Sequence, residues 1–213
     1  MPGSGTDGTS REVSRKAHGI LPAFATARGM GWTLAVTGLI GFLASGQLLL
    51  ERLALYENPD YVTSCDISPL ISCGEVFRTW QAAVFGFPNP LIGIVSFAIV
   101  LTTSAALLSG ARCARWYWMG LQVGVSLGMV FVVWLWSQAL FEIHILCLYC
   151  MAVWAAMIVL FVLLTARNVL HSVIPVPAGA TRFLGEWAPA LAAVLILATA
   201  ASVFFSFIDG FIA

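Results

Sequence analysis

Five long apolar stretches stand out along the 213-residue chain. Each holds about 20 residues or more, and at about 1.5 Å rise per residue such a helix crosses a hydrocarbon core of about 30 Å. The pattern therefore predicts five membrane-spanning helices, at 30–50, 90–109, 116–141, 147–166 and 187–207.

Composition supports the same interpretation. Hydrophobic residues make up 60% of the chain and charged residues only 9%, whereas a soluble domain carries about 25% charged residues. A net charge of zero argues against a nucleic-acid partner. We expect a disordered cytoplasmic tail over 1–29, which is polar and rich in Gly and Ser, and a single membrane domain over 30–213.

Lys and Arg predict the orientation, because they concentrate in cytoplasmic connections. Eight lie in the amino-terminal tail and in the connections after the second and fourth stretches, against two on the other side, Arg52 and Arg78. This places the amino terminus in the cytoplasm and the connection over 52–88 outside it. Because that connection is itself rich in apolar residues, we expect it to fold back as a cap on the outer end of the bundle.

Four of the five cysteines fall on the outer side. Cys65 and Cys73 lie in the 52–88 connection, and Cys147 and Cys150 form a C-x-x-C at the start of the fourth stretch. Thiols outside the cytoplasm are expected to be oxidised, so Cys65 and Cys73 are predicted to form a disulfide, either redox-active or a simple structural cross-link. Cys113 lies on the cytoplasmic side among arginines and is expected to be dispensable.

The C-x-x-C favours reactive thiols. At a helix start its two sulfurs share one face, and the positive end of the helix dipole favours a thiolate, above all at Cys147. The alternatives are two buried cysteines that act as small hydrophobic residues, or a metal site. Seven residues separate Cys65 from Cys73, which is too many for a zinc knuckle, so we expect no metal.

Two dithiol pairs facing one compartment suggest an electron relay by thiol–disulfide exchange. The natural lipid-soluble acceptor of two electrons is a quinone, whose pocket would be apolar with a few hydrogen-bond donors. Asn89, between two prolines where the second stretch begins, is a candidate donor. It is equally typical of a turn residue or a helix N-cap.

Three motifs carry a resemblance to a known family: CDISPLISCGEVF over 65–77, PNPLIG over 88–93 and CLYC over 147–150. Together they resemble the vitamin K epoxide reductase family, in particular bacterial members that lack a fused thioredoxin domain and have a fifth span. The resemblance implies an all-α membrane protein with four helices around a quinone pocket. It also implies a fifth helix outside these four and an extracytoplasmic loop that caps them.

The resemblance also implies a role for each matching residue. Cys65 would meet a soluble partner, Cys73 would exchange with Cys147, and Cys150 would face the quinone. The quinone contacts would be Asn89, an aromatic wall at Phe77, the hydroxyl position Thr79 and the position four residues after Cys150. The family often has tyrosine at this last position, whereas this chain has Trp154, whose indole N–H donates but does not accept.

The function expected from this resemblance is a thiol:quinone oxidoreductase in the bacterial cytoplasmic (inner) membrane. It would reoxidise a separate thioredoxin-like disulfide-forming protein of the cell envelope and reduce menaquinone, ubiquinone or a vitamin K-type quinone. The alternatives are a vitamin K or quinone epoxide reductase that runs in the reducing direction, a membrane protein that binds a soft metal, and a structural membrane subunit.

Overall fold

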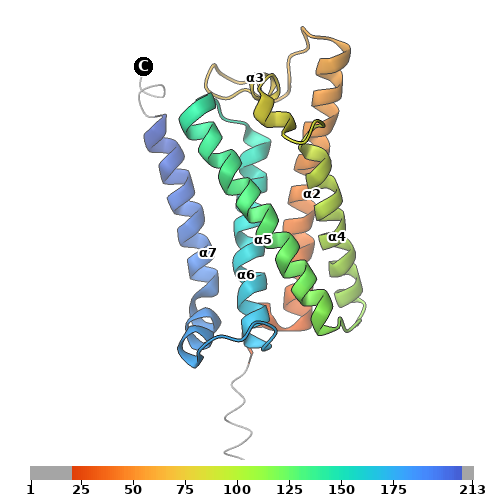
Figure 1. Cartoon of the computed structure of the whole chain (residues 1–213), viewed down its shortest axis with the longest axis vertical. Helices are drawn as coiled ribbons and strands as arrows, with labels where there is room; N and C mark the ends of the chain where they lie inside the picture. Colours follow the sequence, from red (N-terminus) through yellow and green to blue (C-terminus); the bar gives the residue numbers. More distant parts are fainter. Residues whose placement is uncertain (1–20, 208–213) are drawn as a thin grey trace, which may run out of the picture.

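The computed structural model describes residues 21–207 as a bundle of long, roughly parallel and antiparallel helices (Figure 1). Five of the described helices are long and apolar enough to cross a membrane, as predicted. They are α2 (Ala27–Glu57), α4 (Pro90–Leu108), α5 (Arg115–Gln138), α6 (Leu148–Leu170) and α7 (Ala178–Ser206). α5 continues without a break into a π-helical turn, η3 (Ala139–Ile143).

Helix boundaries differ most at the first and last spans. α2 begins at Ala27 after a short 3₁₀ turn, η1 (Ala23–Ala25), so the part of the predicted tail over 21–29 is structured, and residues 1–20 lie outside the described range. α2 also runs past the end of its apolar stretch to Glu57. The charged residues Glu51 and Arg52 do not end the helix, because Gln47 and Tyr56, one turn away, hydrogen bond to them.

α2 and α6 form the centre of the bundle. α2 packs against α4 and α6, and α6 also packs against α5 and α7. α2 and α4 approach closely: a Cβ atom on Gly41 would lie 2.2 Å from the ring of Phe97, and one on Gly93 would lie 2.2 Å from Ser45 Oγ. α7 packs on the α6 side at the edge of the bundle (Figure 1), which agrees with a fifth helix outside a four-helix core.

The connection between α2 and α4 lies across one end of the bundle, as the predicted cap does (Figure 1). It contains α3 (Cys73–Phe77) and the 3₁₀ turn η2 (Trp80–Ala83). Two backbone hydrogen bonds join it to the segment before α6: Leu146 N–H donates to Leu70 O at 2.8 Å, and Ser72 N–H donates to Leu146 O at 3.0 Å. These bonds hold the loop cysteines against the start of α6.

Candidate redox site

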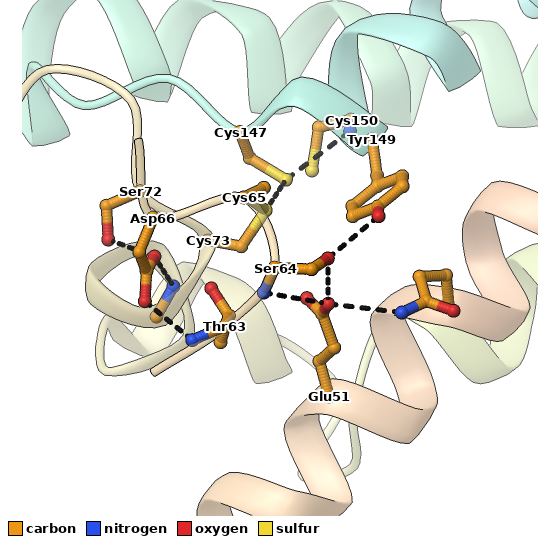
Figure 2. Close-up of a disulfide and its surroundings, with 12 residues drawn as sticks. Glu51, Thr63, Ser64, Cys65, Asp66, Ser72, Cys73, Cys147, Tyr149 and Cys150 are labelled. Carbon is orange, nitrogen blue, oxygen red and sulfur yellow. Dashed lines mark hydrogen bonds between the residues drawn. A yellow bond between two sulfur atoms is a disulfide. The ribbon is translucent and has the colours of Figure 1, made fainter. Parts of the chain in front are cut away.

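Cys65 and Cys73 of the cap loop meet Cys147 and Cys150 at the start of α6 (Figure 2). Cys65 and Cys73 form the predicted disulfide, and Cys147 and Cys150 are free thiols. Cys73 Sγ lies 3.2 Å from Cys147 Sγ. This separation places the Cys147 sulfur against the disulfide, as exchange between the two pairs requires.

Local structure fixes the two facing sulfurs. Cys73 is the first residue of α3, whose N-cap, Ser72, accepts a hydrogen bond from Glu75 N–H at 3.1 Å. Cys147 is itself the N-cap of α6, and its sulfur accepts from Cys150 N–H at 3.4 Å. The chain reaches Cys147 through His144, whose left-handed backbone (φ 56°) ends the π-helical turn.

Burial works against the thiolate that the helix start was expected to favour. Burial raises the pKa of the Cys147 thiol well above its usual value, and the neighbouring Cys150 thiol raises it further. The Cys150 N–H bond acts in the opposite direction but is the weaker influence. A low-dielectric environment disfavours the charged form, so here burial outweighs the helix terminus.

Asp66 holds the disulfide loop in shape. One carboxylate oxygen accepts from Ser72 Oγ at 2.7 Å and Gly74 N–H at 3.0 Å, and the other accepts from Thr63 N–H at 2.8 Å. Burial alone would raise the pKa of Asp66, but these hydrogen bonds together bring it below its usual value of 3.8. Asp66 therefore favours the folded loop as a carboxylate.

The sulfurs differ in exposure. The two disulfide sulfurs belong to residues that are 1% and 0% exposed, and Cys147 is 4% exposed. Cys150 is only half-buried, and both Cys147 and Cys150 line a cavity of about 450 Å³. The cavity runs down between α4 and α5, which supply most of its apolar wall. Its volume and lining fit a small, mostly apolar ligand such as a quinone ring.

Three of the four predicted quinone contacts line this cavity: Phe77, Asn89 and Trp154. Phe77 and Trp154 are both buried. The indole N–H of Trp154 makes no hydrogen bond to any described residue, so it is available as a donor. Thr79 is not part of the cavity wall, and its hydroxyl donates to Val76 O at 2.7 Å within the cap loop.

The side chain of Asn89 hydrogen bonds to the backbone of the cap loop. Its Nδ2 donates to Gln81 O at 2.7 Å, and its Oδ1 accepts from Val84 N–H at 3.2 Å. It stands at the N-cap position of α4 but makes no side-chain capping bond. Because these bonds use one of its two N–H groups, the second is left for a ligand in the cavity.

Several polar groups around the cavity and the cysteines were not predicted from the sequence. Gln81 is buried on the cavity wall, and its Nε2 donates to Gln138 Oε1 at 3.3 Å. A second group connects Glu51, Ser64 and Tyr149 next to the cysteines (Figure 2). The only sequence signals were that Ser64 precedes Cys65 and that Tyr149 lies inside the C-x-x-C.

Comparison with known families agrees with this geometry. The model of the vitamin K epoxide reductase family matches residues 32–165, which is more than half of the chain. The chain belongs to this family. No match was found among curated proteins. Membership makes the protein a multi-pass membrane oxidoreductase linked to thiols and quinone. The matched range covers Cys65, Cys73, Cys147 and Cys150 and ends before α7.

Proposed function

We propose that the protein is a membrane thiol:quinone oxidoreductase that reoxidises a separate thioredoxin-like disulfide-forming partner. The observation that carries the proposal is the 3.2 Å separation between Cys73 Sγ and Cys147 Sγ. It connects a loop disulfide to a dithiol, and the last cysteine of that dithiol lines an apolar cavity.

The relay begins at the loop. Cys65 is 1% exposed, so the loop must open before a partner thiolate attacks Cys65 Sγ. The Cys65–Cys73 bond then breaks, and the partner's second thiol displaces Cys65. The partner leaves oxidised, and the loop holds two thiols. Cys73 then attacks Cys147 of an oxidised Cys147–Cys150 pair and releases Cys150. Cys65 attacks Cys73, which restores the loop disulfide and frees Cys147. The outcome is the arrangement of bonds in the structure, with two electrons on the helix pair.

The last step takes place at the cavity. Cys147 and Cys150 become a disulfide, and their two electrons and two protons convert the quinone to a hydroquinone. Asn89 and Trp154 offer N–H donors to the quinone oxygens, and Phe77 walls the ring. Burial raises the pKa of the Cys147 thiol and so favours its protonated form in the reduced helix pair.

The proposed setting is the bacterial cytoplasmic membrane, with the amino terminus inside and the cysteines facing the cell envelope. The uneven distribution of Lys and Arg supports this orientation. Thiol–disulfide exchange is reversible, so the same geometry also serves a quinone or epoxide reductase that runs in the reducing direction. The relative potentials of the partner and the quinone decide the direction.

Two variants test the relay in detergent-purified protein supplied with a reduced thioredoxin-like protein and a short-chain naphthoquinone. Cys150→Ala should lower quinone reduction about 1,000-fold or more, because the sulfur at the cavity is removed. Cys65→Ala should block exchange with the protein partner to a similar extent yet leave the helix pair reducible by dithiothreitol. Turnover of the partner by both variants at wild-type rates would exclude the relay.

Metal analysis of the same preparation tests the alternative function. The sulfurs of Cys65, Cys73 and Cys147 lie within 4.8 Å of one another, close enough for a soft metal once all three are thiolates. In the structure two of them are joined in a disulfide and are not thiolate ligands. Stoichiometric bound metal that persists through turnover would favour a metal-binding protein over the relay.

A further inference from the structure

A buried carboxylate lies beside the loop disulfide and takes no part in the relay described above. Glu51 is 2% exposed, near the outer end of α2. Its Oε1 accepts hydrogen bonds from Ser64 Oγ, from Ser64 N–H at 3.1 Å and from Gln47 Nε2 at 3.1 Å. One oxygen atom of α2 therefore holds the residue immediately before Cys65.

The same contacts extend to the C-x-x-C. Ser64 Oγ lies 2.8 Å from the hydroxyl of Tyr149, which stands between Cys147 and Cys150 in the sequence (Figure 2). The ring of Tyr149 packs against the buried cluster that contains Cys65, Cys73 and Cys147. The loop, α2 and α6 thus meet at Ser64, and we call the contacts among Glu51, Ser64 and Tyr149 the clasp.

The charge of Glu51 is not balanced by an ion pair. Both ion pairs within the described part of the chain involve other residues. The neighbouring guanidinium of Arg52 donates to Tyr56 OH and lies 5.5 Å from the centre of the Phe77 ring. The second carboxylate oxygen of Glu51, Oε2, is buried with no hydrogen-bond partner in the described residues. All of the hydrogen bonding of this carboxylate is thus on the oxygen that holds Ser64.

Resolution of the mixed disulfide depends on where the Cys65 sulfur lies. When Cys73 has formed a mixed disulfide with Cys147, only attack by Cys65 on Cys73 restores the loop disulfide and frees Cys147. That attack requires the Cys65 sulfur to stay close to Cys73 while the bond between them is open. One arm of the loop is held by its backbone bonds to Leu146. The arm that carries Cys65 is tied within the loop by Asp66, and its bonds to α2 are made at Ser64.

We infer that Glu51 is a positioning residue whose clasp keeps Cys65 in place to resolve the mixed disulfide between Cys73 and Cys147. The inference rests on the proposed function and adds a residue to it. The clasp acts through hydrogen-bond acceptance by Oε1. An amide in the place of the carboxylate therefore preserves most of its effect.

The test follows the mixed disulfide during turnover with the reduced thioredoxin-like protein and a short-chain naphthoquinone. In Glu51→Ala, the turnover rate should fall about tenfold to 100-fold, as expected when a charge-assisted hydrogen bond that positions a reacting group is lost. The fraction of chains with a Cys73–Cys147 bond, measured by peptide mass after acid quenching and alkylation, should rise from minor to major. Glu51→Gln should restore turnover to within about threefold of the wild type, because its carbonyl still accepts from Ser64.

Two controls separate positioning from loss of structure. Glu57→Ala removes an exposed carboxylate from the same helix end and should leave turnover unchanged. A single oxidation of the fully reduced protein by the naphthoquinone, which uses only the helix pair, should proceed at the wild-type rate in Glu51→Ala.

The outcomes are distinguishable. Turnover of Glu51→Ala at the wild-type rate overturns the clasp and leaves the relay intact. Equal loss in Glu51→Gln and Glu51→Ala overturns positioning, because the charge rather than the acceptor is then required. A slowed single oxidation in Glu51→Ala also overturns it. A wild-type protein that does not reduce the naphthoquinone overturns the proposed function and the clasp with it.

Discussion

The two ends of the bundle differ in how completely their buried polar groups are hydrogen bonded. At the cysteine end, several buried polar atoms lack a hydrogen-bond partner within the described residues: Glu51 Oε2, Arg52 Nη1, Thr63 Oγ1 and Trp136 Nε1. At the opposite end, Asn168 is fully buried and its amide is bonded on both sides. Its Nδ2 donates to Gln122 Oε1 at 3.0 Å, and its Oδ1 accepts from Arg167 Nη1 at 3.0 Å.

The opposite end is built as a structural core. The Arg167 guanidinium lies 3.5 Å above the Trp118 ring, and Ser104 Oγ donates to Gly31 O at 2.7 Å between α4 and α2. Leaving a buried polar group unpaired costs about 1–3 kcal/mol. The cysteine end therefore gives up stability where a loop must exchange bonds, and the opposite end holds the helices together.

Asn168→Ala should have the largest effect on stability, because it removes the buried amide that is hydrogen bonded at the opposite end. Loss of the amide leaves Gln122 with an unpaired buried oxygen, so we expect destabilisation of about 1–3 kcal/mol. This corresponds to a fall in unfolding temperature of about 2–4 °C per kcal/mol for a chain of this size. Thermal unfolding in detergent measures it, with Thr102→Ala as a control because its exposed hydroxyl bonds only within α4.

Asn168→Ala should leave the chemistry at the cysteine end almost unchanged. Quinone reduction per folded molecule should stay within about twofold of the wild type, because the change lies far from the sulfurs along α6. A selective loss of turnover with no change in unfolding temperature would contradict the division of roles between the ends.

At the cysteine end, Asp66→Asn should change how the stability of the protein depends on pH. Hydrogen bonds lower the pKa of Asp66 in the folded protein, so its stabilising contribution is present above the usual value of 3.8 and is lost as pH falls through the folded value. Unfolding temperature measured between about pH 2 and 5 should therefore show an acid decline in the wild type that is smaller in the variant. An identical decline in both proteins would assign the acid sensitivity to other carboxylates.

Cys113→Ser should have the smallest effect. Cys113 is half-buried and packs against the hydrophobic core formed by residues such as Trp118 and Leu164, away from the other cysteines. The exchange of sulfur for oxygen should leave quinone reduction unchanged and alter the unfolding temperature by at most a few degrees. A measurable loss of turnover would mean that a thiol at the opposite end contributes to the relay.

The five spans were predictable because hydropathy is a local property of the chain. The disulfide in the cap was expected because both cysteines were placed outside the cytoplasm, and exchange between Cys73 and Cys147 was implied by the family resemblance. The extent of α2 was not predictable, since its charged end is stabilised by neighbours one turn away, Gln47 and Tyr56. Thr79 was expected at the quinone because the resemblance places a hydroxyl there, but its hydroxyl bonds to Val76 O within its own turn. Asn89 was placed at the cavity, although its bonds to the cap required the fold.

The sequence by itself determined that this is a helical membrane protein with two dithiol pairs, because burial in lipid demands long apolar helices and because paired cysteines are visible as letters. Only the tertiary structure decided that Cys147 is buried against the disulfide, that Cys150 lines the cavity, and that Glu51 holds Ser64. These relations join residues far apart in the chain. Their burial and hydrogen bonds exist only once the cap loop has packed onto α2 and α6.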